Sequence, residues 1–348
     1  MTKLPQDGSN DSQSKFKDEQ IESREMAAPA RAGFGTKVKR HCARFWWVHV
    51  IAFCLIFLII ALCLVYVGMP KIAQHDVDRS SLEFKALKFE NPSMEEITLT
   101  QDGVLHNPSM YTPTLDSFKA GSYLVTNGSF GAKAIIDVQM PEIHATKPQS
   151  DQGVFKQVVP IVDIDQLTAY ATEVVGNEYV ETALAGKTKL HLGALPVVNV
   201  NYNSTSRYKG LNGLKGFNVT NVRINITAAA GTPNLVGNAF VPNPSVMTIE
   251  MGNVTLSLRT EKAGFIGTTT IPNFTLVPGD NNFPMTGTLN QTAVLASMVD
   301  GIATMLIKGQ NVTYNGVALT YYEAALASHE LVLPMNVLQI VADSAKPE

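Results

Sequence analysis

The chain has few cysteines, few charged residues and no excess of positive charge, and each shortage excludes a class of protein. Its 348 residues include three cysteines, all between positions 42 and 63, which excludes a disulfide-stabilised secreted scaffold. Its 27 Lys and Arg against 30 Asp and Glu give a net charge of −3, whereas a nucleic-acid binder needs a basic surface. We therefore expect no nucleic-acid partner. With 45% hydrophobic residues, the chain is also too apolar to be disordered throughout.

One stretch lacks charge altogether. Residues 46–68, WWVHVIAFCLIFLIIALCLVYVG, contain no Asp, Glu, Lys or Arg. About 20 apolar residues cross the hydrocarbon core of a bilayer as a helix, because a helix satisfies its own backbone hydrogen-bonding groups. Trp46, Trp47 and Tyr66 lie near the ends of the run, where aromatic rings favour the headgroup region. The run predicts a single-pass transmembrane signal-anchor helix at 46–68, since no later run is apolar enough for a second span.

The flanks of this helix predict its orientation. Residues 31–45 carry five basic residues and no acidic one, whereas residues 69–83 carry two basic and three acidic residues. Because positively charged flanks stay in the cytosol, we predict a cytosolic N-terminus and a lumenal or extracellular C-terminal part. Residues 1–45, rich in Lys, Asp, Glu, Ser and Gln, predict a disordered cytosolic tail. The net charge then divides into +3 on the tail and −6 beyond it.

The part after residue 68 is rich in N-glycosylation sequons, Asn-x-Ser/Thr. Its content of Asn, Ser and Thr would give roughly three by chance, and it holds eight. Since this part is predicted to be lumenal or extracellular, we expect the eight asparagines to carry glycans, although an Asn- and Thr-rich β protein also produces sequons incidentally. They are Asn127, Asn203, Asn218, Asn225, Asn253, Asn273, Asn290 and Asn311. A ninth sequon, at Asn10, lies in the predicted tail and should stay unmodified.

The same part has the patterns of β-structure with two helical insertions. Apolar and polar residues alternate at 222–227 and 254–259, as in strands with one buried face, and this places Asn225 on the outer side. Apolar residues recur at helical spacing at 165–176 and 291–309, which predicts two helices.

The order of these features repeats along the chain. Asn107-Pro-Ser and Asn243-Pro-Ser lie 136 residues apart, each is followed by strands, and each set of strands is followed by one of the helices. We therefore predict a mainly β fold of two tandem antiparallel β-sandwich modules, each with one helix, at 71–210 and 211–348. The transmembrane helix and the disordered tail precede them.

Residues that carry chemistry are scattered. The histidines after the span have no metal-binding spacing, and AGKT at 185–188 lacks the first glycine of a phosphate-binding loop, so we interpret it as a turn. Asp163 and Asp165 are interpreted as helix-capping acids rather than as a catalytic pair. We expect no catalytic, cofactor-binding or metal-binding residue, and a protein that is not an enzyme.

Three segments of the second predicted module resemble a known family. They are VPNPSVMTIEMGNVTL at 241–256, GTTTIP at 267–272 and NFTLVPGDNN at 273–282. They resemble fungal single-pass membrane proteins with a domain of unknown function, similar to the yeast vacuolar-membrane protein that terminates autophagy. They also resemble the group-2 late-embryogenesis-abundant domain. The resemblance covers most of 71–340 and implies a small antiparallel β-sandwich with one helix and a vacuolar membrane location, but no catalytic residue.

These observations predict a glycosylated, non-enzymatic, single-pass membrane protein whose lumenal β modules act in interaction or regulation with protein partners. The vacuolar membrane is the expected location, with the plasma membrane or another endomembrane as the alternative. A lipid or apolar-ligand binding module is the main alternative function, and it predicts a continuous apolar cavity between the sheets. A hydrolase of unfamiliar type is the lower-ranked alternative, and it predicts titratable residues that converge in a pocket.

Overall fold

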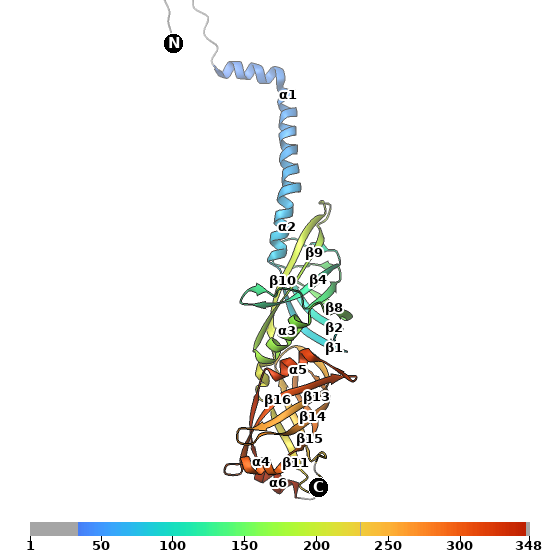
Figure 1. Ribbon diagram of the computed structural model, residues 1–348. Coiled ribbons are helices and arrows are strands. Elements are labelled where there is room, and N and C mark those ends of the chain that lie inside the picture. The colour runs from blue at the N-terminus through green and yellow to red at the C-terminus, as the bar shows by residue number, and fades with distance from the viewer. Residues whose placement is uncertain (1–33, 230, 346–348) are drawn as a thin grey trace, which may run out of the picture. The chain divides into compact units, whose positions relative to one another are not determined.

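The computed structural model describes the backbone of residues 34–229 and 231–345 and the side chains of 45–229 and 231–345 (Figure 1). The described residues fall into two compact units, which divide between Ile60 and Ala61. Most of the predicted disordered tail at 1–45 lies outside the described residues.

The described part of the first unit lies in one long helix. Helix α1, Phe34–Cys63, begins before the apolar run and contains most of it. No Gly or Pro interrupts the sequence from Thr36 to Cys63, and only Phe45, at φ −119° and ψ 25°, leaves the helical conformation.

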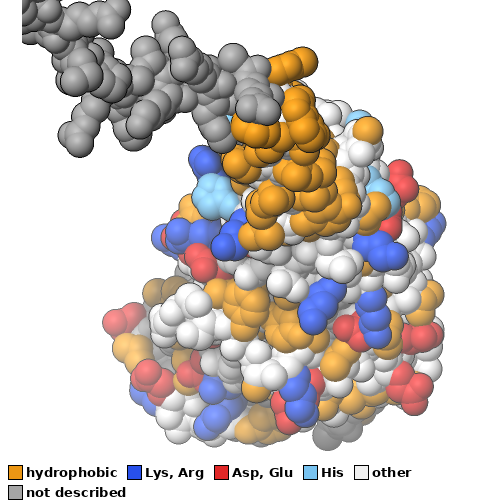
Figure 2. Space-filling model, turned by 90° about the horizontal axis from the view of Figure 1, so that it is seen from above, with side chains coloured by type: hydrophobic (Ala, Val, Ile, Leu, Met, Phe, Trp, Pro, Cys, Tyr) orange, Lys and Arg blue, Asp and Glu red, His pale blue; other side chains and the backbone are white. Residues whose placement is uncertain are grey.

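The predicted span lies in this helical region. Among the described residues, one helix, Phe45–Asp78, is long and apolar enough to cross a membrane. Residues 45–60 are all exposed, as side chains that face lipid must be. Figure 2 shows one large cluster of hydrophobic side chains, and smaller hydrophobic patches lie among the Lys, Arg, Asp and Glu side chains of the remaining surface.

The second unit is mainly β, which confirms the predicted fold class. Its described strands form two sheets of eleven and seven strands. The larger sheet contains β1 Ser81–Glu90, β2 Glu96–His106, β8 Gln149–Pro160, β11 Asn218–Ile224, β12 Leu235–Asn243, β13 Met247–Thr260, β14 Gly264–Leu276, β15 Gly279–Leu289, β16 Ile302–Tyr314, β17 Val317–Ala318 and β18 Leu331–Asn336. The smaller sheet contains β3 Thr114–Leu115, β4 Phe118–Thr126, β5 Ser129–Phe130, β6 Ile136–Met140, β7 Ile143–His144, β9 Tyr179–His191 and β10 Val198–Lys209.

Short helices lie at the ends of the strands. The described helices after α1 are the π-helical turn η1 Leu64–Gly68, α2 Met69–Asp78, α3 Ile164–Gly176, the 3-10 turn η2 Asn212–Leu214, α4 Gln291–Ser297, α5 Thr320–Ala327 and α6 Val337–Ser344. The predicted helix at 165–176 is confirmed as α3. Its N-cap is Asp163, whose carboxylate accepts hydrogen bonds from the backbone N–H of Asp165 and Gln166. The Lys133 ammonium donates to the same carboxylate and lowers the pKa of Asp163.

The first module, β1 to β10 with α2 and α3, is a sandwich. Its core lies between β1 and β2 of the larger sheet and β4, β6, β9 and β10 of the smaller one, with α3 at one end. Strand β10 alternates strictly between exposed and buried residues, which is the pattern of a strand with one face on a core. Two polar contacts join the sheets inside the core: Leu82 N–H donates to Ser204 Oγ, and Ser206 Oγ donates to Leu82 O.

The second module, β11 to β18 with α4 to α6, also packs β-strands around an apolar core. Its strands belong to one sheet in the order β11-β12-β15-β14-β13-β16-β18. Residues from all of these strands, from α4 and from α6 line one small apolar cavity, so the sheet curls around its own core. The module therefore has an apolar core of its own, which its strands and these two helices enclose.

The predicted helix at 291–309 is wrong beyond Ser297. Helix α4 ends there, and β16 starts at Ile302. Asp300 and Gly301 have φ values of 53° and 82°, and Val299 and Ile302 exchange backbone hydrogen bonds, so a tight turn ends the helix. Because Ala303, Met305 and Ile307 are buried at alternate positions, the apolar residues of this segment also fit a strand.

The two modules share the larger sheet through one parallel pair of strands. Strand β1 pairs with β13 in the register Leu87↔Met247 to Phe89↔Ile249. β16 occupies the rest of the same edge of β13, from Asn253 to Thr260. Gly252 lies between the two partners at φ +79°, and a Cβ there would lie 2.4 Å from Thr313 O, so only glycine fits this bulge.

Glu250 ties the three strands together at this junction. Its Oε2 accepts a hydrogen bond of 2.7 Å from Asn91 N–H, just after β1, and its Oε1 accepts one of 3.3 Å from the Tyr314 hydroxyl of β16. Tyr314 also donates to Asn91 Oδ1 at 3.1 Å. Helices α3 and α5 pack together beside the junction, so polar and apolar contacts both join the modules.

Buried tyrosines give the stability of this unit a defined pH dependence. Burial raises the pKa values of Tyr202 and Tyr208 to about 12. Below pH 10 these phenols are neutral in both the folded and the unfolded chain, whereas above about pH 10 they ionise in the unfolded chain first. We expect the free energy of unfolding to fall between about pH 10 and pH 12, by about 1.4 kcal/mol per pH unit for each such tyrosine. Denaturant unfolding over this pH range measures the slope.

Single Tyr→Phe variants test this assignment. Tyr202→Phe removes one buried phenol and should make the slope shallower. Tyr179→Phe is the control, because this ring is 43% exposed. An equal slope in the wild type and in Tyr202→Phe would contradict the assignment.

Candidate functional site

Side chains of helix α2 attach this helix to the strands and loops of the first module. Pro70 lies in its first turn, directly after the π-helical turn η1. Ala73 and Val77, four residues apart on one face, are buried, whereas Lys71 and Arg79 are exposed. Only Arg79 and Ser80 separate α2 from β1, so α2 enters the sandwich without a linker.

The amide of Gln74 attaches α2 to the edge of strand β10. Its Nε2 donates to Asn201 O at 2.8 Å, and its Oε1 accepts from Asn201 N–H at 2.8 Å. In the described part of the chain β10 pairs only with β9, so Gln74 takes the place of a neighbouring strand at Asn201. The pair satisfies two backbone groups of an otherwise open edge.

The carboxylate of Asp76 attaches the same helix to the loop after β2. Ser109 Oγ donates to Asp76 Oδ2 at 2.6 Å. Ser109 belongs to the Asn107-Pro-Ser motif, in which Asn107 Oδ1 accepts from Ser109 N–H and Asn107 Nδ2 donates to Tyr111 O. Ser109 Oγ also accepts from Tyr111 N–H at 3.1 Å, so its proton is directed to Asp76.

The second Asn-Pro-Ser motif forms the same turn without a docked helix. Ser245 N–H donates to Asn243 Oδ1 at 3.0 Å, Asn243 Nδ2 donates to Met247 O, and Met247 N–H donates to Ser245 Oγ. Here Ser245 Oγ donates back to Asn243 Oδ1, at 2.6 Å. The motif is therefore a structural turn in both modules, and only the first module uses its serine hydroxyl to hold another element.

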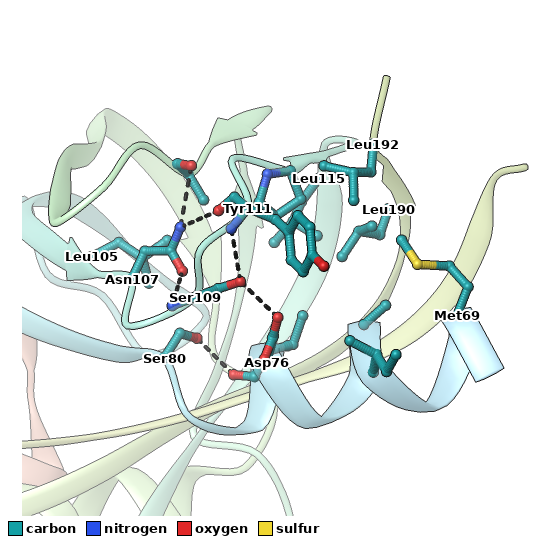
Figure 3. A pocket seen from close by; sticks show the side chains of 15 residues that line it. Met69, Asp76, Ser80, Leu105, Asn107, Ser109, Tyr111, Leu115, Leu190 and Leu192 are labelled. Carbon is teal, nitrogen blue, oxygen red and sulfur yellow. Dashed lines mark hydrogen bonds between the residues drawn. The ribbon is translucent and has the colours of Figure 1, made fainter. Parts of the chain in front are cut away.

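Around these contacts lies a small apolar pocket, which we call the juxtamembrane pocket (Figure 3). The Asp76–Ser109 hydrogen bond lies at its edge, and the Tyr111 ring faces it. Its cavity volume of about 40 Å³ is close to the space that one water molecule takes in the liquid. The pocket is lined by Met69, Ile72, Ala73, Asp76, Val77, Ser80, Leu105, Asn107, Ser109, Tyr111, Pro113, Leu115, Ala145, Leu190 and Leu192.

All eight sequon asparagines are exposed, so each has room for a glycan. Asn225 lies just after β11, which ends at Ile224, and its Oδ1 accepts from Thr227 N–H and Thr227 Oγ1. The other seven lie on strands or at strand ends. The exposed set is Asn127, Asn203, Asn218, Asn225, Asn253, Asn273, Asn290 and Asn311.

Three of these sequons lie together. Asn273 N–H donates to Asn253 Oδ1 at 3.1 Å, and Asn311 lies on β16, which pairs with β13 next to Asn253. Elsewhere, Asn290 Oδ1 caps α4 by accepting from Ala293 N–H, which leaves Nδ2, the atom that carries a glycan, outside that bond.

The segment AGKT at 185–188 lies inside β9, and its interpretation as a turn is wrong. A Cβ at Gly186 would lie 2.7 Å from Lys119 O, so this glycine lets β4 approach β9 closely. Within the described residues, no group of three or more His, Cys, Asp or Glu side chains could hold a metal ion.

An open groove lies in the second module, between its edge strands β11 and β18. Its volume is about 1060 Å³, it opens to solvent, and its lining is polar and apolar in similar measure. Residues of helix α6 line it. In this helix the Ser344 hydroxyl donates to Ile340 O, and Ser344 Oγ accepts from Ile224 N–H of β11. Asn218, a sequon residue, lines the groove.

Gln74 and Asp76 are not among the residues predicted from the sequence, since they lie within 69–83, the flank of the predicted span. One available signal is the spacing of Ala73 and Val77, which gives α2 a buried face just after the apolar run. The partner Ser109 lies 33 residues away, and no local pattern connects the two.

Comparison with known proteins gives one family. Residues 133–258 match a family described as a protein of unknown function (DUF3712), so the chain contains this domain of unknown function. The match begins before β6 and ends within β13, and it therefore crosses the predicted module boundary at 210/211. A search of curated proteins finds no match.

Several solved structures are weakly similar. The solution structure of AT1g01470 from Arabidopsis thaliana is 14% identical, over 35% of this chain and 76% of that protein, with a TM-score of 0.23. Red sea bream transglutaminase is 11% identical, over 73% of this chain and 31% of that one, with a TM-score of 0.26. The periplasmic chaperone SfaE is 11% identical, over 73% and 98% of the two chains, with a TM-score of 0.15. At these TM-scores the likenesses carry no functional argument.

Removing the carboxylate of Asp76 should loosen α2. Asp76→Ala leaves Ser109 without its charged acceptor, at a cost of about 1–2 kcal/mol for opening this helix. Trypsin should then cleave after the exposed Lys71 and Arg79 about 5- to 30-fold faster in the purified full chain.

A matched substitution separates this effect from a general loss of charge. Asp102→Ala removes an exposed carboxylate from β2 of the same module and should leave cleavage at these two sites unchanged. Equal rates for the wild type and Asp76→Ala would show that this hydrogen bond does not hold the helix.

Proposed function

We propose that this chain is a glycosylated, non-enzymatic, single-pass membrane protein whose β modules act in interaction or regulation on the lumenal or extracellular side. The observation that carries the proposal is the attachment of α2: the helix that contains the apolar run continues to Asp78, and Gln74 and Asp76 hold its last part on the first module. Such an attachment presents folded modules beside a membrane.

The polar groups of the juxtamembrane pocket support a non-enzymatic role. Asn107 and Ser109 commit their side-chain hydrogen-bonding groups to the turn and to Asp76, and reacting groups need free capacity for a substrate. Elsewhere, the phenols of Tyr170 and Tyr208 bond to each other inside the core at 3.0 Å.

The lipid-binding alternative receives less support. The apolar cavities in the two cores have volumes of about 20 to 40 Å³, whereas small-molecule sites occupy several hundred Å³. The groove beside β11 is larger but half polar, and a glycan on Asn218 would stand at its wall.

The resemblance to fungal proteins of the vacuolar membrane supports a vacuolar location, with the β modules in the lumen. The excess of sequons after the span, their exposure and the basic flank before it all support the same orientation.

Orientation and glycosylation are tested together in sealed vesicles. We expect protease added outside to remove the tail and leave the part after residue 68 intact, and endoglycosidase to reduce the apparent mass of that part. Each Asn→Gln substitution at one of the eight sequons should lower the apparent mass of the untreated protein by one glycan. Asn10→Gln, in the tail, should leave the apparent mass unchanged. Cleavage of the β modules from outside would refute the orientation.

Partner binding is tested by cross-linking native membranes and isolating the chain through its tail. We expect cross-links between the β modules and the same partner proteins in independent preparations. These partners should be absent from a chain that ends after Gly68. Modules that cross-link only to themselves, or partners retained by the shortened chain, would contradict an interaction role for the modules.

A further inference from the structure

Two uncharged loops of the first module lie beside the first turn of α2. One is PSMYTP at 108–113, after β2, and the other is LGALPV at 192–197, which joins β9 to β10. Met69 lines the juxtamembrane pocket together with Tyr111 and Leu192, so both loops meet the start of α2. In Figure 1 the β9–β10 hairpin rises beside this helix.

Large apolar side chains of these loops are exposed on the surface. Met110 is 81% exposed and Val197 is 52% exposed, and Tyr111 and Leu195 are exposed with them. Ile72, on the first turn of α2, is 50% exposed. Apolar side chains gathered at one place on a surface mark a contact with a membrane or another protein.

The position of α2 in the chain decides between these two partners. Its first residue, Met69, follows the apolar run 46–68 directly. One helical turn rises 5.4 Å, and the headgroup region adds about 5–8 Å to each side of the hydrocarbon core. The loops beside this turn therefore lie at the depth of the headgroups.

We propose that the loops 108–113 and 192–197 insert into the headgroup layer of the bilayer that the span crosses, and hold the first module against it. The inference rests on the proposed function, because it requires 46–68 to span a membrane. A bilayer suits these side chains: Met, Leu and Val enter its apolar edge, and the Tyr111 ring suits its interface. Neither loop contains Lys or Arg, so depth rather than attraction to anionic lipid determines the contact.

Fluorophores attached to single cysteines test this contact. In a chain with Cys42, Cys54 and Cys63 replaced by Ser, an environment-sensitive fluorophore is attached at Met110→Cys, Leu195→Cys, Val332→Cys or Ile56→Cys. Each full-length chain is reconstituted into phosphatidylcholine vesicles with its β modules outside. Val332 is the matched control, because it is apolar and 62% exposed but lies on β18 of the second module. Ile56 reports on the span itself.

We expect labels at 110 and 195 to emit at shorter wavelength than the label at 332. Nitroxide lipids should quench them, and aqueous iodide should quench them several-fold less than the label at 332. If 110 and 195 behave as 332 does while 56 is quenched only by nitroxide lipids, the loop contact is wrong and the membrane anchor stands. If iodide also quenches the label at 56, the proposed anchor itself fails.

Discussion

The parallel pairing of β1 with β13 is the contact on which the arrangement of the second unit depends. Leu87 N–H donates to Val246 O at 3.1 Å, and the carboxylate of Glu250 binds groups that follow β1 and end β16. A strand from the first module thus completes the sheet of the second. Separating the modules would expose two strand edges and leave this carboxylate without its donors. The modules therefore have separate cores but share one sheet, and they are not independent domains joined by a linker.

Because the modules share a sheet, the attachment of α2 affects both of them. Gln74 and Asp76 fix α2 to the first module alone, but the continuous sheet extends that constraint to the second. Gln74 holds α2 at the edge of β10, and the Ser109 hydroxyl holds it at the loop after β2. Through the shared sheet this helix is therefore connected to both modules and to the exposed sequons that they carry. The same serine turn occurs in the second module, where its hydroxyl stays within the turn. The two turns therefore differ in the acceptor of the serine hydroxyl, and only the hydroxyl of Ser109 binds a neighbouring helix.

The sequence predicted the features that depend on local patterns. The apolar helix, the mainly β fold, the helix at 164–176 and its cap at Asp163 each follow from spacing within a few turns. The error at 291–309 arose because apolar residues at Leu295, Met298 and Ile302 fit a helix, whereas Asp300-Gly301 forms a turn and the following residues alternate as a strand. The pairing of β1 with β13 and the bond from Ser109 to Asp76 join residues far apart in sequence. No periodicity reveals such partners.

Hydrogen exchange at the β1–β13 junction measures whether the two modules open together. The amides of Leu87 to Phe89 and of Met247 to Ile249, followed by mass spectrometry on the full chain, report how the shared sheet opens. If the two modules unfold as one cooperative unit, both segments should exchange with the same opening free energy. That free energy should equal the opening free energy of the β11–β16 core. Fast exchange of both segments while each module core stays protected would show that the modules open independently, and would contradict the account.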